Sequence, residues 1–263
     1  GIKLASKNSL NYSKKIRKKL YRLSWGGWNI KILDLGFFKI GNQNSDTQFA
    51  LREILDDENC KLGEYSNVGF QKHINNVDEI KLFENMMFEA YSLGKVKNKI
   101  INTEPIFRNS DLVNISIRAV KSGDINNSHE FTNGLSSYEF CSLCRFAGLS
   151  TNLNLISFKS DYQSSAISSL VSEGIWYAID GMDSVVEENI EVNSDNYIFY
   201  NVSVDNFDLK FVKSLLSNRW WVCLENINLI QMEKTYIPCV EDDYLSSKNS
   251  VLSDRILTRI KNK

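Results

Sequence analysis

Segments with a strand pattern alternate with segments with a helix pattern over residues 1–182, and this order is what most constrains the fold. The expected strands, which are short and apolar or alternate between apolar and polar residues, are 29–35, 65–70, 112–120 and 153–158. The expected helices, which carry apolar residues three and four positions apart, are 11–23, 78–93, 137–147 and 163–179. Because this order is typical of a mainly parallel sheet covered by helices, we predict an α/β fold.

Serines and glycines mark the boundaries expected for these helices. Ser136 or Ser137 is expected to cap the helix 137–147, because a serine hydroxyl accepts a hydrogen bond from a free N–H of the first turn. Gly94, Gly148 and Gly181 are expected to end their helices, since glycine tolerates the left-handed conformation common after a last turn.

The pattern changes after about residue 182. Short β segments are expected at 197–204, 220–224 and 235–240, followed by a polar, helical tail. We therefore predict a main α/β domain at 1–182 and a C-terminal appendage at 183–263 packed on it. The aromatic residues Trp220, Trp221 and Tyr236 either form an exposed anchor for a partner or pack the appendage on the core, and packing is favoured.

Composition argues against several classes of function. The formal net charge of −1 gives no overall field that would attract nucleic acid or an anionic membrane, and no run of 18 apolar residues predicts a membrane span. The basic run KKIRKK at 14–19 fits the solvated face of an amphipathic helix, and a phosphate or RNA contact is the less favoured alternative. We expect a cytoplasmic protein without a signal peptide, and the opening Gly1-Ile2 indicates that the natural chain begins earlier.

The five cysteines have no disulfide-framework spacing, so free thiols in a reducing compartment are expected. Cys141 and Cys144 have the C-x-x-C spacing, but they fall within a helical pattern beside apolar residues. No second pair or nearby histidine completes a zinc site. Two small buried side chains are the favoured interpretation.

Several stretches in order resemble the arginase, agmatinase and formimidoylglutamase family, the ureohydrolases, and most of all its divergent Bacteroidetes branch. They are IRKKLYRLSWGGWNIKILDLG, DTQFALREIL, YSNVGFQKH, MMFEAYSLGKV, EPIFRNSDLVNISIRAV, NGLSSYEFCSLCRFAGLS, EGIWYAIDG, RWWVCLE and YIPCVEDDYL. The resemblance implies an arginase-like three-layer α/β/α fold and oligomers. It also implies two Mn²⁺ ions bridged by hydroxide, which lower the pKa of the shared water.

The stretch NISIRAV at 114–120 lies where active members carry Ser-Phe-Asp-x-Asp-x-x-Asp. Strand alternation places Asn114, Ser116 and Arg118 on one side, and the alignment puts Ser116, Arg118 and Lys121 at the three aspartates. A guanidinium does not deprotonate and cannot ligate a metal, and two added cations repel dications. Arg118 then either occupies the former metal space, paired with Asp124, Asp161 or Glu139, or lies at the rim without a role.

The other family signatures are missing. No Gly-Gly-x-His and no Asp-x-His-x-Asp occur in the sequence, and the two histidines, His73 and His129, are expected to be ordinary loop residues. The glutamate that the family places after a late strand falls at Ser160; Asp161 is one step away, and alternation turns it to the other face.

A seam lies near residues 50–64. DTQFALREIL resembles the helix before the Gly-Gly-x-His strand, whereas REILDDENCKLGEYSNVGF resembles a segment well after the Asp-x-His-x-Asp strand. An internal segment is therefore either deleted here or left out of the sequence. A true deletion would require the backbone groups of a sheet to be paired again.

Three functions follow. The first is a non-catalytic protein of the ureohydrolase fold, a pseudoenzyme without cofactor that acts through a protein partner or as a homo-oligomer. The second is a divergent Mn²⁺-dependent hydrolase of a guanidino or formimino C–N bond in a linear amidine. The third is a metal-free binder of a small anion, held by Arg118 and Lys121 at the strand ends, where open α/β sheets bind ligands. The first is favoured, because every recognisable metal ligand has been replaced.

Overall fold

The structure is a computed structural model, and its helices, strands and turns are described for a defined set of residues. These are residues 2–5, 15–16, 19, 65–73, 81, 85, 89–126, 131–160, 162–191, 194–205, 207–224 and 236–261. The expected strand 29–35 and the seam near 50–64 lie outside the described residues, as does most of the expected helix 11–23.

A three-stranded parallel sheet forms the centre of the first unit. Strand β5 (Leu155–Lys159) lies between β1 (Ile2–Ala5) and β4 (Leu112–Ser116), and both neighbours run parallel to it. Ile156 and Phe158 of β5 are buried, since alternate residues of a strand face the same side. The parallel sheet expected from the strand–helix order is confirmed for these strands.

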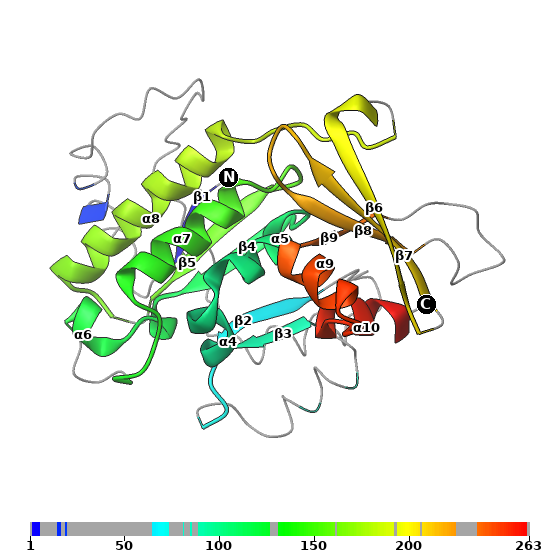
Figure 1. Ribbon diagram of the computed structural model, residues 1–263. Coiled ribbons are helices and arrows are strands. Elements are labelled where there is room, and N and C mark those ends of the chain that lie inside the picture. Colours follow the sequence, from blue (N-terminus) through cyan, green and yellow to red (C-terminus); the bar gives the residue numbers. More distant parts are fainter. Residues whose placement is uncertain are drawn as a thin grey trace, which may run out of the picture.

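Two long helices, α7 (Ser137–Gly148) and α8 (Ser165–Asp183), pack side by side on one face of this sheet (Figure 1). The ring of Phe140 in α7 lies 6.2 Å from that of Phe158 in β5. Ser136 caps α7 as expected, in a reciprocal capping box with Glu139. The second helical layer of the three-layer prediction is not defined by the described residues and stays a prediction.

Gly148 and Gly181 do not end their helices in the way that the sequence suggests. Gly148 is the last residue of α7, and α8 continues past Gly181 to Asp183. Neither residue has a left-handed backbone conformation; both lie where the two helices touch, so their role is close packing.

The prediction of a helix over 78–93 is wrong at its C-terminal end. Lys81 and Asn85 are helical, but Glu89–Ser92 forms strand β3, which pairs in parallel with β2 (Ser66–Phe70). The new helix α4 (Leu93–Asn98) then begins, capped by Ser92, so Gly94 lies inside a helix. The helical spacing of the apolar residues was overridden because β3 completes a pair with β2, a long-range partner that local periodicity does not show.

The expected strand 112–120 also ends early. After β4, residues Ile117–Ala119 form the 3-10 helix η2, closed by a hydrogen bond from the Val120 N–H to the Ile117 carbonyl (3.0 Å). Ile117 and Val120 are both buried, a spacing of three that suits a 3-10 turn and not a strand. Short helices α5 (Glu104–Phe107), after the 3-10 helix η1 (Ile100–Thr103), and α6 (Ser122–Ile125) complete this unit.

The C-terminal part is a four-stranded antiparallel sheet in the order β6-β7-β8-β9. The strands are β6 (Tyr197–Val204), β7 (Phe207–Ser214), β8 (Trp220–Leu224) and β9 (Tyr236–Cys239). They follow the 3-10 helix η3 (Ser194–Asn196) and precede helices α9 (Glu241–Lys248) and α10 (Asp254–Lys261). The three β segments and the helical tail expected here are confirmed, and β7 was missed.

The two tryptophans of β8 are buried, which overturns the idea of an exposed anchor. Trp220 is 5% and Trp221 is 7% exposed, and Tyr236 is half-buried. Trp220 stacks on Tyr200 and Tyr244 with ring centroids 5.4 and 5.1 Å apart, which fixes α9 against the sheet. The favoured interpretation, plain packing, is confirmed.

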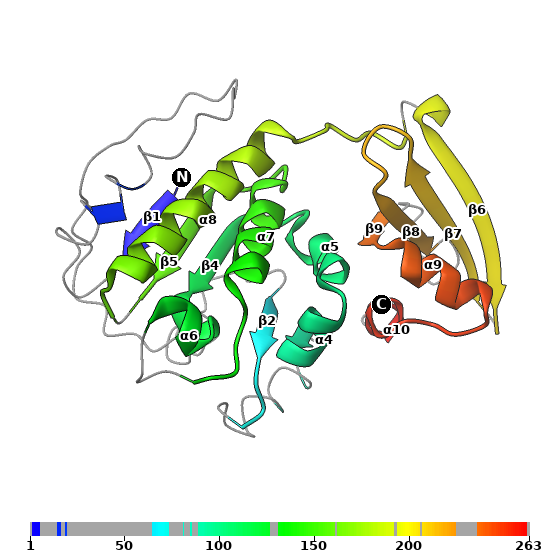
Figure 2. The same ribbon diagram turned by 60° about the vertical axis from the view of Figure 1, so that its left-hand side comes forward.

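The two units lie beside one another, joined by the extended segment after α8 (Figure 2). Each has its own apolar core: one around α7, α8 and the parallel sheet, the other between the antiparallel sheet and helices α9 and α10. None of the described helices is long and apolar enough to cross a membrane.

Candidate functional site

The carboxyl ends of β4 and β5 form the place where the sequence predicts a degenerate metal site. Ser116, the last residue of β4, pairs in register with Lys159, the last residue of β5, and Ser160 follows directly. Because the strands are parallel, these ends meet at one edge of the sheet. The structure therefore brings Ser116 and Ser160 to the same edge, as expected.

Arg118 does not continue the polar side of β4. It lies in η2, past the strand end, and its side chain is exposed. The expected alternation Asn114, Ser116, Arg118 is wrong at its third member, because the 3-10 turn replaces the two-residue period by one of three. Of the carboxylates suggested as its partners, Asp124 contacts Lys121 and Ser137, and Glu139 contacts the cap at Ser136. Asp161 lies outside the described residues.

Lys121 forms an ion pair with Asp124, with its Nζ 3.2 Å from Oδ1. The other carboxylate oxygen, Oδ2, accepts hydrogen bonds from the Ser137 N–H (2.7 Å) and from its hydroxyl (3.0 Å) at the start of α7. Partial burial alone would raise the pKa of Asp124, but the Ser137 N–H and the Lys121 ammonium outweigh it and lower the pKa. An anion bound here would have to compete with Asp124 for the charge of Lys121.

Ser160 is buried and serves a local turn. Its hydroxyl donates to the Tyr162 carbonyl (2.7 Å) and accepts from the Tyr162 N–H (3.3 Å). These two bonds satisfy the hydroxyl within the loop that leads into α8.

These residues do not fit the two Mn²⁺ ions that the resemblance implies. The donors at the strand ends are two hydroxyls, a guanidinium and an ammonium, whereas manganese prefers carboxylate, imidazole and water. Within the described ranges, no group of three or more histidine, cysteine, aspartate or glutamate side chains could hold a metal ion. The site assignment and the prediction that no cofactor is needed both stay predictions.

The remaining chemical candidates of the sequence have ordinary surroundings. His73 is exposed, with its ring 6.0 Å from that of Phe131 in an edge-to-face arrangement, and His129 lies outside the described residues. Cys141 and Cys144 are free, buried thiols inside α7. This confirms the favoured interpretation of the C-x-x-C spacing as two small buried side chains. Burial, assisted by Glu173, raises the pKa of Cys141 to about 12, so its thiolate is not a ready nucleophile.

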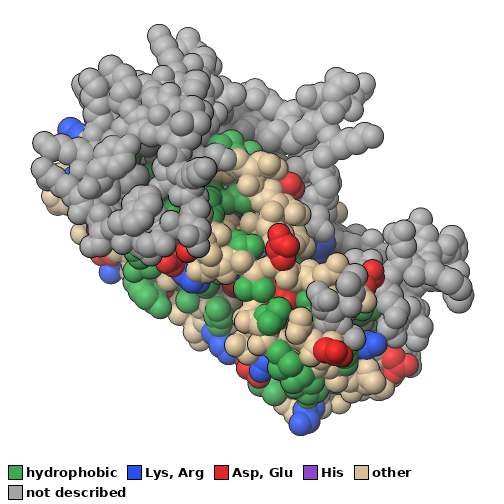
Figure 3. Space-filling view, turned by 90° about the horizontal axis from the view of Figure 1, so that it is seen from above, with side chains coloured by type: hydrophobic (Ala, Val, Ile, Leu, Met, Phe, Trp, Pro, Cys, Tyr) green, Lys and Arg blue, Asp and Glu red, His purple; other side chains and the backbone are tan. Residues whose placement is uncertain are grey.

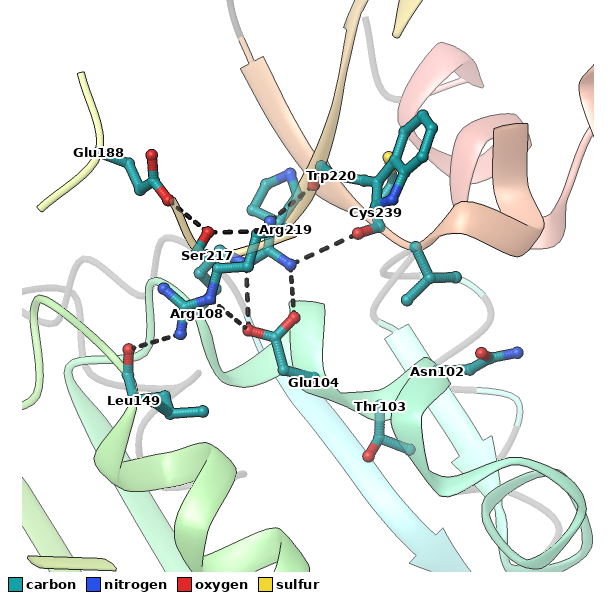
Figure 4. Close-up of polar contacts among 12 residues, drawn as sticks. Asn102, Thr103, Glu104, Arg108, Leu149, Glu188, Ser217, Arg219, Trp220 and Cys239 are labelled. Carbon is teal, nitrogen blue, oxygen red and sulfur yellow. Dashed lines mark hydrogen bonds and ion pairs between the residues drawn. The ribbon is translucent and has the colours of Figure 1, made fainter. Parts of the chain in front are cut away.

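A buried ion cluster between the two units was not predicted (Figure 4). The Glu104 carboxylate of α5 accepts two hydrogen bonds from Arg108: Nε donates to Oε1 (3.2 Å), and Nη2 donates to Oε2. Nε of Arg219 forms an ion pair with the same Oε1 (3.2 Å). Arg219 lies in the turn before β8. All three side chains are at most 10% exposed, so the cluster is shielded from solvent. The sequence signal for it was the spacing of Glu104 and Arg108, four residues apart on a helix.

The two arginines also join the units through backbone carbonyls. Arg108 donates to the Trp220 carbonyl (2.6 Å) and the Cys239 carbonyl (3.4 Å), and Arg219 donates back to the Leu149 carbonyl (3.2 Å). The guanidinium of Arg108 lies 4.7 Å from the ring of Trp221. Burial and the charge of Arg108 lower the pKa of Arg219, and Glu104 opposes this shift. The cluster is a fixed polar contact, and its groups are engaged with one another.

A second polar contact joins α10 to the main unit. Arg255 donates to the Tyr91 hydroxyl (2.9 Å) and the Asn102 carbonyl (3.0 Å), and Arg259 pairs with Glu89 (3.4 Å). Burial raises the pKa of Tyr91 despite the nearby Arg255. The two contacts show how the C-terminal unit is held on the first.

The fold and the strand-end residues define an α/β chain with a parallel sheet, to which an antiparallel β unit is docked.

No known family model and no curated protein matches the sequence. Among solved structures the chain is similar to the Mn²⁺-bound formiminoglutamase of Trypanosoma cruzi, with 14% identity over 53% of this chain and 52% of that chain, at a TM-score of 0.48. It is also similar to two proteins of Bacillus subtilis. The formimidoylglutamase has 11% identity, 46% and 42% coverage and a TM-score of 0.41, and the arginase has 8% identity, 43% and 43% coverage and a TM-score of 0.37. The chain spans about half the length of these solved structures.

Proposed function

We propose that this chain is a non-catalytic protein of ureohydrolase ancestry that acts by binding another protein chain. The observation that carries the first half is the chemistry of the strand ends. Ser116, Arg118, Lys121 and Ser160 stand where the sequence resemblance implies carboxylate ligands, and the nearby Asp124 neutralises Lys121 and holds the start of α7.

Electrostatics support this proposal. Two dications a few ångströms apart need several carboxylates to offset their charge, and each exchange of a carboxylate for a cation changes the local charge by two units. A guanidinium does not deprotonate in proteins, so the exchange of a carboxylate for an arginine is not undone by loss of a proton. Without the paired ions, the activated water of such enzymes is not formed.

The surface of the second unit supports the other half of the proposal. Ile198, Phe199, Leu215, Leu216 and Leu245 are each more than a third exposed, although the unit has a complete apolar core beneath them. On the coloured part of the face in Figure 3, hydrophobic side chains lie among scattered acidic and basic ones. A protein partner suits such a surface better than nucleic acid does.

The experiment combines metal content with turnover. The purified protein is analysed for bound metal, and urea, ammonia and formamide release is measured with arginine, agmatine and formimidoylglutamate in the presence of Mn²⁺. The arginase of Bacillus subtilis serves as the positive control. We expect no turnover above that of free Mn²⁺ and no rise in the melting temperature with added Mn²⁺, because a ligand stabilises only a state that binds it. Turnover with bound manganese would overturn the proposal and support the hydrolase alternative.

A further inference from the structure

Strand β6 forms an outer edge of the antiparallel sheet. It pairs with β7 on one side, and no strand of the described part of the chain pairs with its other side. Figure 2 shows β6 as the outermost strand of the second unit. Such an edge presents a row of N–H and C=O groups that can pair with another strand.

The register shows which groups point outward. Val204 and Phe207 flank the turn and face one another, and residues in this position exchange both hydrogen bonds. The bond from the Leu215 N–H to the Asn196 carbonyl (2.8 Å) continues the same alternation at the other end of the ladder. The even-numbered residues of β6 therefore bond to β7, and the odd-numbered ones direct their N–H and C=O to the open edge: Tyr197, Phe199, Asn201 and Ser203.

This edge lacks the usual protection against pairing. The eight residues YIFYNVSV contain no charged residue and no proline, and their register with β7 runs without a bulge. Ile198 and Phe199 are each 38% exposed, and Leu215 and Leu216, next to the start of β6, are each 54% exposed. Natural edge strands of this length are normally interrupted by lysine, proline or a bulge.

We infer that β6 pairs antiparallel with β6 of a second copy of this chain, about a two-fold axis at Tyr200. This inference rests on the proposed function and names its partner. In this register Phe199 faces Asn201 of the second copy and Tyr197 faces its Ser203. All four outward residues then exchange hydrogen bonds with the same four residues of the other copy, as an isologous interface requires.

Charge permits this arrangement. Lys210 of β7, whose Nζ lies 4.8 Å from the ring centroid of Phe199, is a basic side chain on the outer face near the axis. In such a dimer the two Lys210 residues would lie three strand spacings apart across the sheet and about two residues apart along it. Their backbones would then be roughly 16 Å apart. This is about twice the screening length at physiological ionic strength, so the two lysines would repel each other weakly.

The size of the contact sets its strength. Eight residues give an edge of about 27 Å, less than the contact area of a permanent dimer. Leu215 and Leu216 add apolar area where the start of one β6 lies beside the end of the other. We therefore expect a reversible dimer with a Kd on the order of micromolar.

The first test measures the mass of the full chain in solution over roughly a hundred-fold range of concentration, by light scattering after size exclusion. We expect the mass to rise from that of a monomer to that of a dimer. Phe199→Lys should weaken association by about tenfold or more, because it places a charge on each side of the axis. Tyr138→Lys is the matched control, since Tyr138 of α7 is 74% exposed and lies in the other unit. Circular dichroism shows that each variant is folded.

The second test fixes the register. Tyr200→Cys places two thiols at a non-hydrogen-bonded pair, with Cα atoms about 4.5 Å apart, which a disulfide can span. Ser203→Cys places them roughly 20 Å apart. We expect diamide to cross-link Tyr200→Cys into a covalent dimer and to leave Ser203→Cys monomeric on a denaturing gel.

The outcomes separate this inference from the proposed function. A chain that stays monomeric at every concentration, or a dimer that Phe199→Lys does not weaken, overturns the β6 pairing, whatever other protein binds this chain. Cross-linking of Ser203→Cys in preference to Tyr200→Cys overturns the register. Manganese-dependent turnover by a β6-paired dimer overturns the non-catalytic function and leaves the interface standing.

Discussion

The backbones of Gly148 in α7 and Gly181 in α8 are in contact where the two helices cross. A Cβ built on Gly181 would lie 3.1 Å from the Cα of Gly148 and 2.3 Å from the Arg145 carbonyl oxygen. A Cβ on Gly148 would lie 2.0 Å from the Ala178 carbonyl oxygen. Because these neighbours are backbone atoms, they cannot turn aside as a side chain could. The close approach of α7 and α8 therefore depends on two residues without side chains.

We predict that Gly148→Ala destabilises the protein by about 1–3 kcal/mol, or more if the helices must separate. Gly94→Ala is the control, because it adds a methyl group to helix α4 where no atom lies within 4 Å. The control should be neutral or stabilising by up to about 1 kcal/mol. Urea unfolding checks both, and equal effects of the two substitutions would contradict the packing role of Gly148.

Glu104→Gln should destabilise the protein strongly. The substitution leaves Arg108 and Arg219 buried beside one another without the carboxylate that compensates them, which costs about 3–5 kcal/mol. Lys95→Ala is the control, because it breaks the exposed pair with Asp254 and should cost less than about 1 kcal/mol.

The measurement for Glu104→Gln is the free energy of unfolding in urea, together with limited proteolysis of the segment between α8 and β6. We expect faster cleavage there in the variant, since the cluster joins the two units at that point. A loss of under about 1 kcal/mol with unchanged cleavage would show that the cluster contributes little to docking.

Asp124 should make stability fall at acidic pH. Its pKa is lowered in the folded state, so its contribution is complete above the unfolded pKa of about 3.9 and is lost as the pH falls through the folded value. Asp124→Asn should therefore be less stable than the wild type at pH 7, and the difference should shrink as the pH drops below about 4. Unfolding free energies at several pH values check this, and a difference that stays constant down to about pH 2 would exclude the ionised carboxylate as its source.

Ser136→Ala should cost about 1 kcal/mol, because it removes the hydroxyl that caps α7 and accepts from the Glu139 N–H. Ser142→Ala is the matched control within the same helix. The Ser142 hydroxyl only donates back to the Tyr138 carbonyl, so its loss should be neutral or slightly stabilising. Thermal unfolding of both variants measures the difference, and equal melting temperatures would contradict the capping role.

Local sequence patterns were sufficient where the structure depends on near neighbours. Ser136 caps α7, as one of the two residues expected to do so, and the apolar spacing of α7 and α8 gave their extent to within a few residues. The strands β6, β8 and β9 were also found, because alternation and β-branched or aromatic residues mark them. At the strand-end site, the resemblance pointed to Ser116 and Ser160, and the parallel order of β4 and β5 places both at one edge of the sheet.

The misses depend on a local turn and on strand partners that apolar periodicity does not show. Arg118 left the strand because buried Ile117 and Val120 close a 3-10 turn, and residues 89–92 became β3 because β2 lies beside them. The local pattern does not predict a strand at residues 207–214, although β7 lies there, between β6 and β8 in the sheet. The packing favoured for Trp220 and Trp221 is confirmed, and the structure adds that Tyr244 stacks on Trp220 and that Arg108 lies over Trp221.

The sequence by itself determined much of the order of strands and helices and the cap of α7, because these depend on residue type and local spacing. Only the tertiary structure decided that Glu104 joins Arg108 and Arg219 across the two units, and that no strand of the described residues pairs with the outer edge of β6. Each of these depends on groups far apart in the chain, whose distance and burial are set by packing and leave no mark on local periodicity.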